Sequence, residues 1–137
     1  MTVEVPCKVL LVDDEVEFLQ TVAKRLGRRK LDVSAAHSGE EALQRLAEAC
    51  ADVVVLDVKM PGLDGLETLR RIKSGHPLVE VIMLTGHASV EAAIEGMELG
   101  AFDYLMKPVE FDELLYKIQD AHRKKSIQEA KIRALES

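Results

Sequence analysis

Five short apolar segments recur along the chain, and four of them end on polar residues. Those four are continuous apolar runs rather than alternating patterns, and three of them are rich in Val, Leu and Ile. Such runs are typical of central strands in a parallel sheet, because helices cover both faces of these strands. The remaining segment, Asp32–Ala36, has few large residues, which favours a position at the sheet edge. The expected strands are Lys8–Asp14, Asp32–Ala36, Asp52–Asp57, Val81–Thr85 and Asp103–Lys107, with Asp32–Ala36 at the edge.

Helical segments separate these strands, and apolar residues recur in them at helical spacing. Ser38 followed by Glu41 has the spacing of a capping box, and Asp64 is placed to cap the third helix. The fourth helix is expected to begin at Ser89 and to end at Gly100 in the left-handed conformation. Residues expected to face inward on that helix are Ala93, Ile94 and Met97.

The regular alternation of strands and helices predicts an α/β fold. Strand starts recur every 20 to 30 residues, which suits right-handed crossovers through one helix each. We expect a flavodoxin-like (βα)5 doubly wound parallel sheet with strand order 2-1-3-4-5. The first and fifth helices should cover one face, and the second, third and fourth the other.

The last helix is longer than covering the sheet requires. Its pattern continues from Phe111 almost to Ser137, so we expect a domain over residues 1–122 and a helical extension over 123–137, a possible linker to a further domain. A heptad pattern with polar interruptions predicts a weak parallel homodimer through this helix. The heptad positions are Leu114, Ile118, Ala121, Lys125, Gln128, Ile132 and Leu135.

Composition narrows the class of protein. The chain has 137 residues, the size of one domain, and its net charge of -6 argues against a nucleic-acid-binding surface. The basic run His122–Lys125 is interpreted as a solvated helix face. Cys7 and Cys50 lack metal-ligand spacing and are expected to be reduced thiols. With no apolar run near the roughly 20 residues of a membrane span and no signal-peptide pattern, we expect a cytoplasmic protein with no membrane partner.

The strand ends carry the chemistry. Because the carboxyl ends of parallel strands meet at one edge of the sheet, Asp13, Asp14, Asp57, Thr85 and Lys107 should converge in one cleft. Neighbouring carboxylates repel unless a cation lies between them, and an all-oxygen ligand set favours Mg2+, with Mn2+ as a substitute. Lys107 supplies a second positive charge for a phosphoryl group. Asp57 is the expected nucleophile because it stands apart from the acidic pair.

A set of motifs completes this pattern. Asp13-Asp14, the segment Asp57–Gly65, Thr85-Gly86 and the segment Phe102–Pro108 together resemble the receiver domain of bacterial two-component response regulators. The resemblance spans roughly residues 7–122. The Phe102–Leu105 segment is most similar to receivers of NtrC-like AAA+ transcription activators.

The resemblance implies a role for each matching residue. Asp57 would accept a phosphoryl group from a phosphohistidine of a sensor histidine kinase, and Lys107 would pair with that group. Thr85 and Tyr104 would move as a coupled switch, and the Lys107–Pro108 bond would be cis. Residues implied for Mg2+ are Asp14, Asp57, the main-chain carbonyl of Lys59 and, through water, Asp13. Residues implied to tune the phosphate lifetime are Lys59 and His87.

In this reading the domain is a signalling module rather than an enzyme, although it would catalyse its own phosphorylation and slow dephosphorylation. Phosphorylation would switch the surface of the fourth helix, fifth strand and fifth helix, controlling an output that is most simply transcription. That surface, with the last helix, would also form the homodimer.

Other functions fit the residues less well. A stand-alone receiver would act by protein–protein interaction. A haloacid-dehalogenase-type phosphohydrolase needs a second Asp two residues after its nucleophile on the first strand, whereas Glu15 stands two residues after Asp13. An adaptor that is never phosphorylated would not need the acidic pair with Asp57, Thr85 and Lys107. A dinucleotide-binding domain would need a Gly-rich first turn, which this chain lacks.

Overall fold

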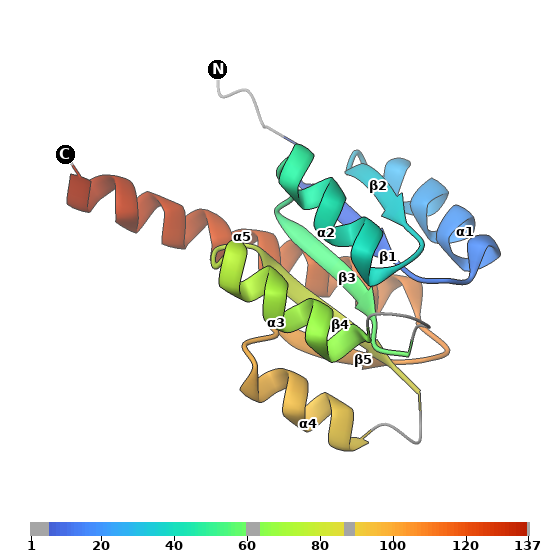
Figure 1. Cartoon of the computed structure of the whole chain (residues 1–137). Coiled ribbons are helices and arrows are strands. Elements are labelled where there is room, and N and C mark those ends of the chain that lie inside the picture. Colours follow the sequence, from blue (N-terminus) through green and yellow to red (C-terminus); the bar gives the residue numbers. More distant parts are fainter. Residues whose placement is uncertain (1–5, 60–63, 87–89, 137) are drawn as a thin grey trace.

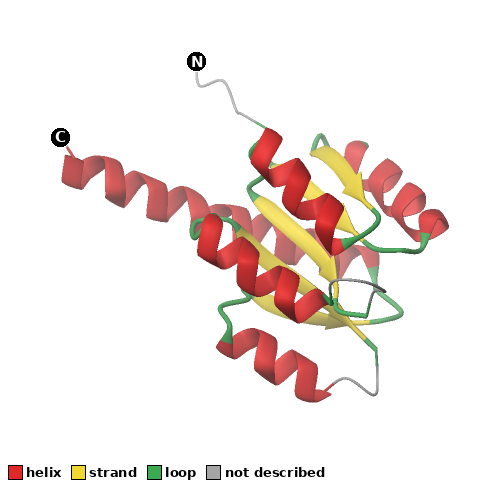
Figure 2. Ribbon diagram, viewed as in Figure 1, coloured by secondary structure: helices red, strands yellow, loops and turns green. Residues whose placement is uncertain are grey.

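A single five-stranded parallel sheet forms the centre of the protein in a computed structural model, which describes residues 6–59, 64–86 and 90–136 (Figures 1 and 2). The strand order is β2-β1-β3-β4-β5, as predicted. The strands are β1 (Lys8–Val12), β2 (Asp32–Ala36), β3 (Val53–Asp57), β4 (Glu80–Thr85) and β5 (Asp103–Met106). The helices are α1 (Val16–Gly27), α2 (Gly39–Glu48), α3 (Gly65–Gly75), α4 (Val90–Glu98) and α5 (Phe111–Glu136).

Helices cover both faces of the sheet, and each face has its own apolar core. One core joins residues of α1 and α5 to the sheet, and the other joins α2 and α3. The fourth helix packs on β4, β5 and α3, on the same side as α2 and α3 (Figure 1). Central strands are therefore buried on both faces, which explains their continuous apolar sequences. The predicted division of the helices is confirmed.

Local sequence sets the helix ends. Ser38 Oγ accepts a hydrogen bond from the Glu41 N–H at 3.1 Å, and Glu41 Oε2 accepts one from the His37 N–H at 3.0 Å. Asp64 Oδ1 caps α3 by accepting a bond from the Glu67 N–H at 2.8 Å. Gly100 has φ +104°, the left-handed conformation expected after α4. The start predicted for α4 at Ser89 lies outside the described residues.

The prediction that Ile94 and Met97 face inward on α4 is wrong. They are 57% and 41% exposed, whereas Ala93 is buried. The reason lies at Gly96, where an added Cβ would stand 2.0 Å from Met83 Sδ. The helix contacts the sheet through its small residues, because Met83 on β4 already fills the space there. The larger apolar side chains are left on the outer side.

The proposed seam of α5 also needs correction. Ile118 and Ala121 are fully buried in the core beneath the sheet, so they are not exposed for a partner. The carboxyl-terminal part of α5 extends past the sheet (Figure 1). Exposed apolar residues on this part are Ile127, Ile132 and Leu135.

Two lysines of the basic run in α5 pair with acidic groups of the domain, although Arg123 and Lys124 are exposed, as predicted for a solvated helix face. Lys125 Nζ lies 3.0 Å from an oxygen of Asp52, just before β3. Lys124 Nζ lies 3.3 Å from Glu80, whose side chain is only 4% exposed at the start of β4. These lysines neutralise acidic groups at the amino ends of the strands. They therefore hold the middle of α5 against the sheet edge opposite the predicted cleft.

Candidate functional site

Three carboxylates converge where β1 and β3 end. Asp13 follows β1 and Asp57 ends β3, and both are buried, whereas Asp14 is exposed. One oxygen from each of the three lies within 4.8 Å of the others. Thr85 ends β4 at the same edge of the sheet and is also buried. The fold therefore brings together side chains that the sequence separates by tens of residues, as predicted.

Lys107 places its ammonium group among these carboxylates. Its Nζ lies 2.8 Å from Asp13 Oδ2, 3.5 Å from Asp57 Oδ2 and 3.6 Å from Glu15 Oε1. The Lys107 N–H donates to the Thr85 carbonyl oxygen at 2.8 Å, which fixes the start of the side chain at the end of β5. The sequence predicts this lysine in the cleft. The sequence does not predict which carboxylate Lys107 contacts most closely, and the structure shows that it is Asp13.

Each buried carboxylate uses its two oxygens differently. Asp13 Oδ1 accepts from the Glu15 N–H, and Asp57 Oδ1 accepts from the Lys59 N–H, both at 3.0 Å. Their Oδ2 atoms face Lys107. The N–H group two residues later in the chain thus orients each side chain, and the second oxygen is left to face the Lys107 ammonium group.

Electrostatics distinguish Asp57 from an ordinary carboxyl. The pKa of Asp57 is raised to about 6, chiefly by burial and also by the charge of Asp13, although the Lys59 N–H and Lys107 lower it. For Lys107, burial lowers the pKa, but the bond to Asp13 and the nearby negative charges outweigh burial and raise it. The cleft therefore holds an excess of negative charge that one lysine only partly neutralises.

Comparison with known proteins agrees with this geometry. Residues 9–119 match the response regulator receiver domain. The chain belongs to this family. It is 37% identical over 113 residues to the transcriptional regulatory protein ZraR of Escherichia coli (strain K12), covering 82% of this chain and 26% of ZraR. It is 37% identical to the DNA-binding transcriptional regulator NtrC of the same strain, covering 82% of this chain and 24% of NtrC.

A solved structure agrees equally well. The response regulator receiver domain protein from Clostridium thermocellum superposes with a TM-score of 0.86 at 40% identity, covering 89% of this chain and 98% of that one. The chain thus spans about a quarter of the length of the curated relatives it matches. Within the described residues, no helix is both long and apolar enough to span a membrane.

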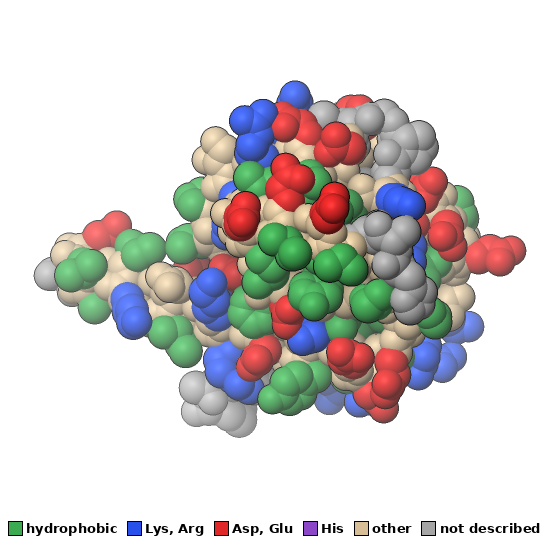
Figure 3. Space-filling view, turned by 90° about the horizontal axis from the view of Figure 1, so that it is seen from below, with side chains coloured by type: hydrophobic (Ala, Val, Ile, Leu, Met, Phe, Trp, Pro, Cys, Tyr) green, Lys and Arg blue, Asp and Glu red, His purple; other side chains and the backbone are tan. Residues whose placement is uncertain are grey.

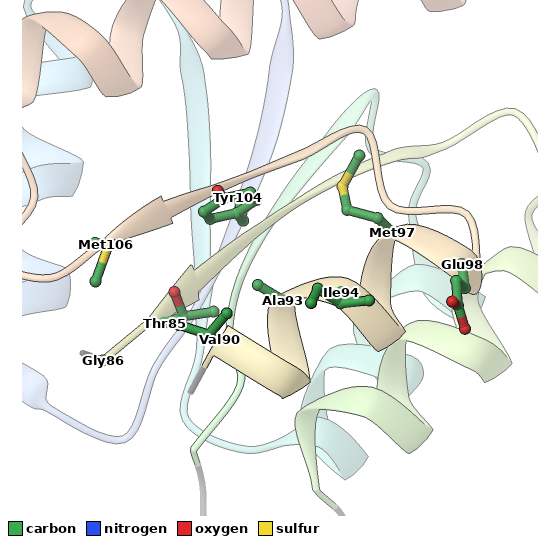
Figure 4. Close-up of a pocket in the computed structure, with 9 residues that line it drawn as sticks. All are labelled: Thr85, Gly86, Val90, Ala93, Ile94, Met97, Glu98, Tyr104 and Met106. Carbon is green, nitrogen blue, oxygen red and sulfur yellow. The ribbon is translucent and has the colours of Figure 1, made fainter. Parts of the chain in front are cut away.

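The expected switch residues of this receiver lie beside a cavity between α4 and β5. Thr85 and Tyr104 both line it, and its volume is about 430 Å³ (Figure 4). The Tyr104 ring is 43% exposed, so it does not fill the space beside Thr85. Figure 3 looks onto α4 and shows apolar side chains gathered in the middle of this face, with acidic side chains next to them. Exposed apolar residues lining the cavity include Val90, Ile94, Met97 and Met106.

The remaining expectations have mixed outcomes. The Lys107–Pro108 bond is cis. Lys59 is exposed and donates its N–H to Asp57. His87 lies outside the described residues. The ring of Phe18, on α1, lies 4.9 Å from Lys107 Nζ, a contact that sequence reasoning missed because only the fold makes it.

Sequence reasoning also missed a second cluster. Cys7, Asp52 and His122 have ligand atoms within 4.8 Å of one another. Asp52, however, already accepts from the Lys8 N–H at 2.9 Å and from Lys125 at 3.0 Å. Burial, and then the charge of Asp52, raises the pKa of the Cys7 thiol to about 12, which keeps it protonated. The cluster is therefore explained as an anchor for α5 rather than as a cation site.

Proposed function

We propose that this receiver is a phosphorylation-activated switch whose acceptor is Asp57. The observation that carries the proposal is the convergence of Asp13, Asp14, Asp57 and Lys107 at the carboxyl edge of the sheet. With a pKa of about 6, Asp57 is mainly ionised at neutral pH, as a nucleophile must be. Its orientation is set by the Lys59 N–H, so little rearrangement is needed before attack.

In the proposed reaction an Asp57 oxygen attacks the phosphorus atom of a phosphohistidine on a sensor histidine kinase. The new P–O bond forms as the P–N bond breaks, and the imidazole nitrogen leaves with the electron pair. Lys107 moves from its carboxylate partners to neutralise the transferred phosphoryl oxygens, and the Thr85 hydroxyl donates to one of them. Hydrolysis of the acyl phosphate by water releases inorganic phosphate and returns Asp57 to its unphosphorylated form.

The carboxylates fit a divalent cation. Asp13, Asp14 and Asp57 supply only oxygen ligands, which suit Mg2+ or its substitute Mn2+. The residues proposed to hold it are Asp14, Asp57, the main-chain carbonyl of Lys59 and, through water, Asp13. When bound, the metal neutralises negative charge on the carboxylates and the incoming phosphoryl group.

Phosphorylation would act by shifting a population of conformations. A Thr85 hydroxyl drawn to the phosphoryl group would vacate space beside the cavity, and the half-exposed Tyr104 ring would turn inward. A change from 1:99 to 99:1 needs about 5.5 kcal/mol of differential stabilisation, to which a charge-assisted network contributes a large part. Lys59 and His87 would tune the lifetime of the phosphorylated form.

The output proposed is control of transcription through a further domain. ZraR and NtrC are named as transcriptional regulators, and each is about four times the length of the matched region. The net charge of -6 favours an indirect role, with no nucleic acid bound by this chain itself. Residues 1–122 would form the receiver and 123–137 the linking helix. A weak homodimer would use the α4, β5 and α5 surface together with the end of α5.

A phosphorylation assay tests the acceptor. Acetyl phosphate with Mg2+ should add one acid-labile phosphoryl group, detected by intact mass. Asp57→Asn should abolish the product and EDTA should prevent it, while Asp120→Asn, on the surface of α5 and paired with Arg123, should behave as wild type. Equal labelling of the Asp57→Asn variant would refute the assignment.

Sedimentation tests the dimer. We would compare the whole chain with a version ending at Arg123, each with and without beryllofluoride, a phosphoryl mimic. Self-association should be weaker in the shorter chain, because the exposed Ile127, Ile132 and Leu135 are then missing. Monomers in all four samples at high concentration would refute the dimer, but they would not affect the proposal that Asp57 is phosphorylated.

A further inference from the structure

Phe18 lies against the ammonium group of the phosphorylation site. It is a half-buried residue of α1 that packs on the core shared by α1, α5 and the sheet. Its ring centroid is 4.9 Å from Lys107 Nζ, within the range of a cation–π interaction. Phe18 is thus a neighbour of the cleft, although it has no oxygen or nitrogen to contribute to it.

Lys107 needs such a neighbour because its backbone is fixed but its side chain is long. Its N–H is bound to Thr85, while four rotatable bonds separate its Cα from the ammonium group. The side chain is 24% exposed, so solvent is within reach. Without a wall, the ammonium group would spend part of its time hydrated outside the cleft, where it could not meet a phosphoryl group.

The carboxylates do not hold Lys107 in the position that transfer requires. Its shortest contact is to Asp13 at 2.8 Å, whereas Asp57 is 3.5 Å away and Glu15, on the exposed rim, is 3.6 Å away. The ammonium group thus lies closest to Asp13 rather than to Asp57, the proposed acceptor. An aromatic face attracts a cation without forming a directed bond, so it can confine the ammonium while allowing it to change partners.

We infer that Phe18 is a positioning residue for phosphoryl transfer, which keeps Lys107 in the cleft through a cation–π contact. The inference rests on the proposed role of Asp57 as the acceptor. An aromatic ring is needed here and not only apolar volume, because the ring quadrupole attracts the ammonium and an aliphatic side chain does not. Loss of the ring should therefore slow transfer without changing which residue is phosphorylated.

The test compares the rate of phosphorylation by acetyl phosphate and Mg2+ in four chains: wild type, Phe18→Leu, Phe18→Tyr and Phe102→Leu. Phe102 is the matched control, because it is a half-buried phenylalanine at the edge of the same core with Lys124 5.8 Å from its ring. It lies beside Val81, at the opposite end of β4 from Thr85. Thermal unfolding of all four chains measures the loss of packing separately.

We expect Phe18→Leu to lower the maximal rate about 3- to 10-fold, with a smaller change in half-saturation by acetyl phosphate. Phe18→Tyr should retain nearly the wild-type rate, and Phe102→Leu should be unaffected even if it unfolds at a lower temperature. A normal rate in Phe18→Leu, or an equal loss in Phe18→Leu and Phe18→Tyr, would overturn the inference. Asp57→Asn is added as a fifth chain, and labelling that persists in this variant would refute the proposed acceptor instead.

Discussion

Replacing Asp57 by Asn should make this protein more stable in the absence of divalent metal. The Asp57 side chain is buried beside the negative charge of Asp13, and its pKa is raised from 3.8 to about 6. An acid with a raised pKa binds its proton more tightly in the folded state than in the unfolded state. The contribution of Asp57 to the stability of the folded state is therefore most favourable below its pKa in the unfolded state. This contribution is lost as pH rises through the interval from 3.8 to about 6.

The size of the effect follows from that interval. A shift of about two pKa units corresponds to roughly 3 kcal/mol, and this figure already includes the attraction of the Asp57 carboxylate to Lys107. We expect Asp57→Asn to raise the free energy of unfolding by about 1–3 kcal/mol near pH 8, and the midpoint of thermal unfolding by several degrees. Near pH 4 the gain should shrink to about 0.5 kcal/mol or less, because Asp57 is then protonated in the folded wild type.

Urea denaturation in EDTA at several pH values between about pH 4 and pH 8 would measure this dependence. Asp120→Asn, at an exposed site, serves as the control and should show no comparable gain. Adding Mg2+ should stabilise the wild type more than the Asp57→Asn variant, since binding to the folded state adds stability by mass action. If Asp57→Asn is neutral or destabilising at pH 8 without metal, the argument that burial strains this carboxylate is wrong.

Three further predictions concern the packing, the α5 anchor and the switch. In urea denaturation, Gly65→Ala should lower the free energy of unfolding by about 2 kcal/mol or more, because the added Cβ would lie 2.4 Å from the backbone of Val58. Gly75→Ala has nothing within 4 Å of its added Cβ and should raise the free energy of unfolding by about 0.5 kcal/mol. Equal effects of the two substitutions would contradict this prediction. Glu80→Gln removes the partner of lysines on α3 and α5, so amide hydrogen exchange in the end of α5 should quicken, and unchanged protection would count against an anchor. Thr85→Ala should still be phosphorylated but should show smaller NMR shifts at Tyr104 on phosphorylation; shifts equal to wild type would exclude the coupling.

The sequence by itself determined the elements and the members of the cleft. Buried parallel strands need apolar residues on both faces, so β1, β3 and β4 appear as continuous runs. Helix caps such as Ser38 and Asp64 accept hydrogen bonds from N–H groups only three residues later, so a short stretch of sequence is enough to predict them. The position of Asp57 at a strand end then followed from topology, because the carboxyl ends of parallel strands share one edge.

Tertiary structure decided the contacts between distant segments. The inner face of α4 was mispredicted because Met83 leaves room only for a residue as small as Gly96, a condition set by another element. The ion pairs of Lys124 and Lys125 cannot be seen in the sequence, because their acidic partners, Glu80 and Asp52, lie far away along the chain. The close approach of Phe18 to Lys107 likewise depends on the fold, which brings the start of α1 near the residue that follows β5. Periodicity shows which residues a helix can bury, but the shape and charge of the surface it meets determine which contacts form.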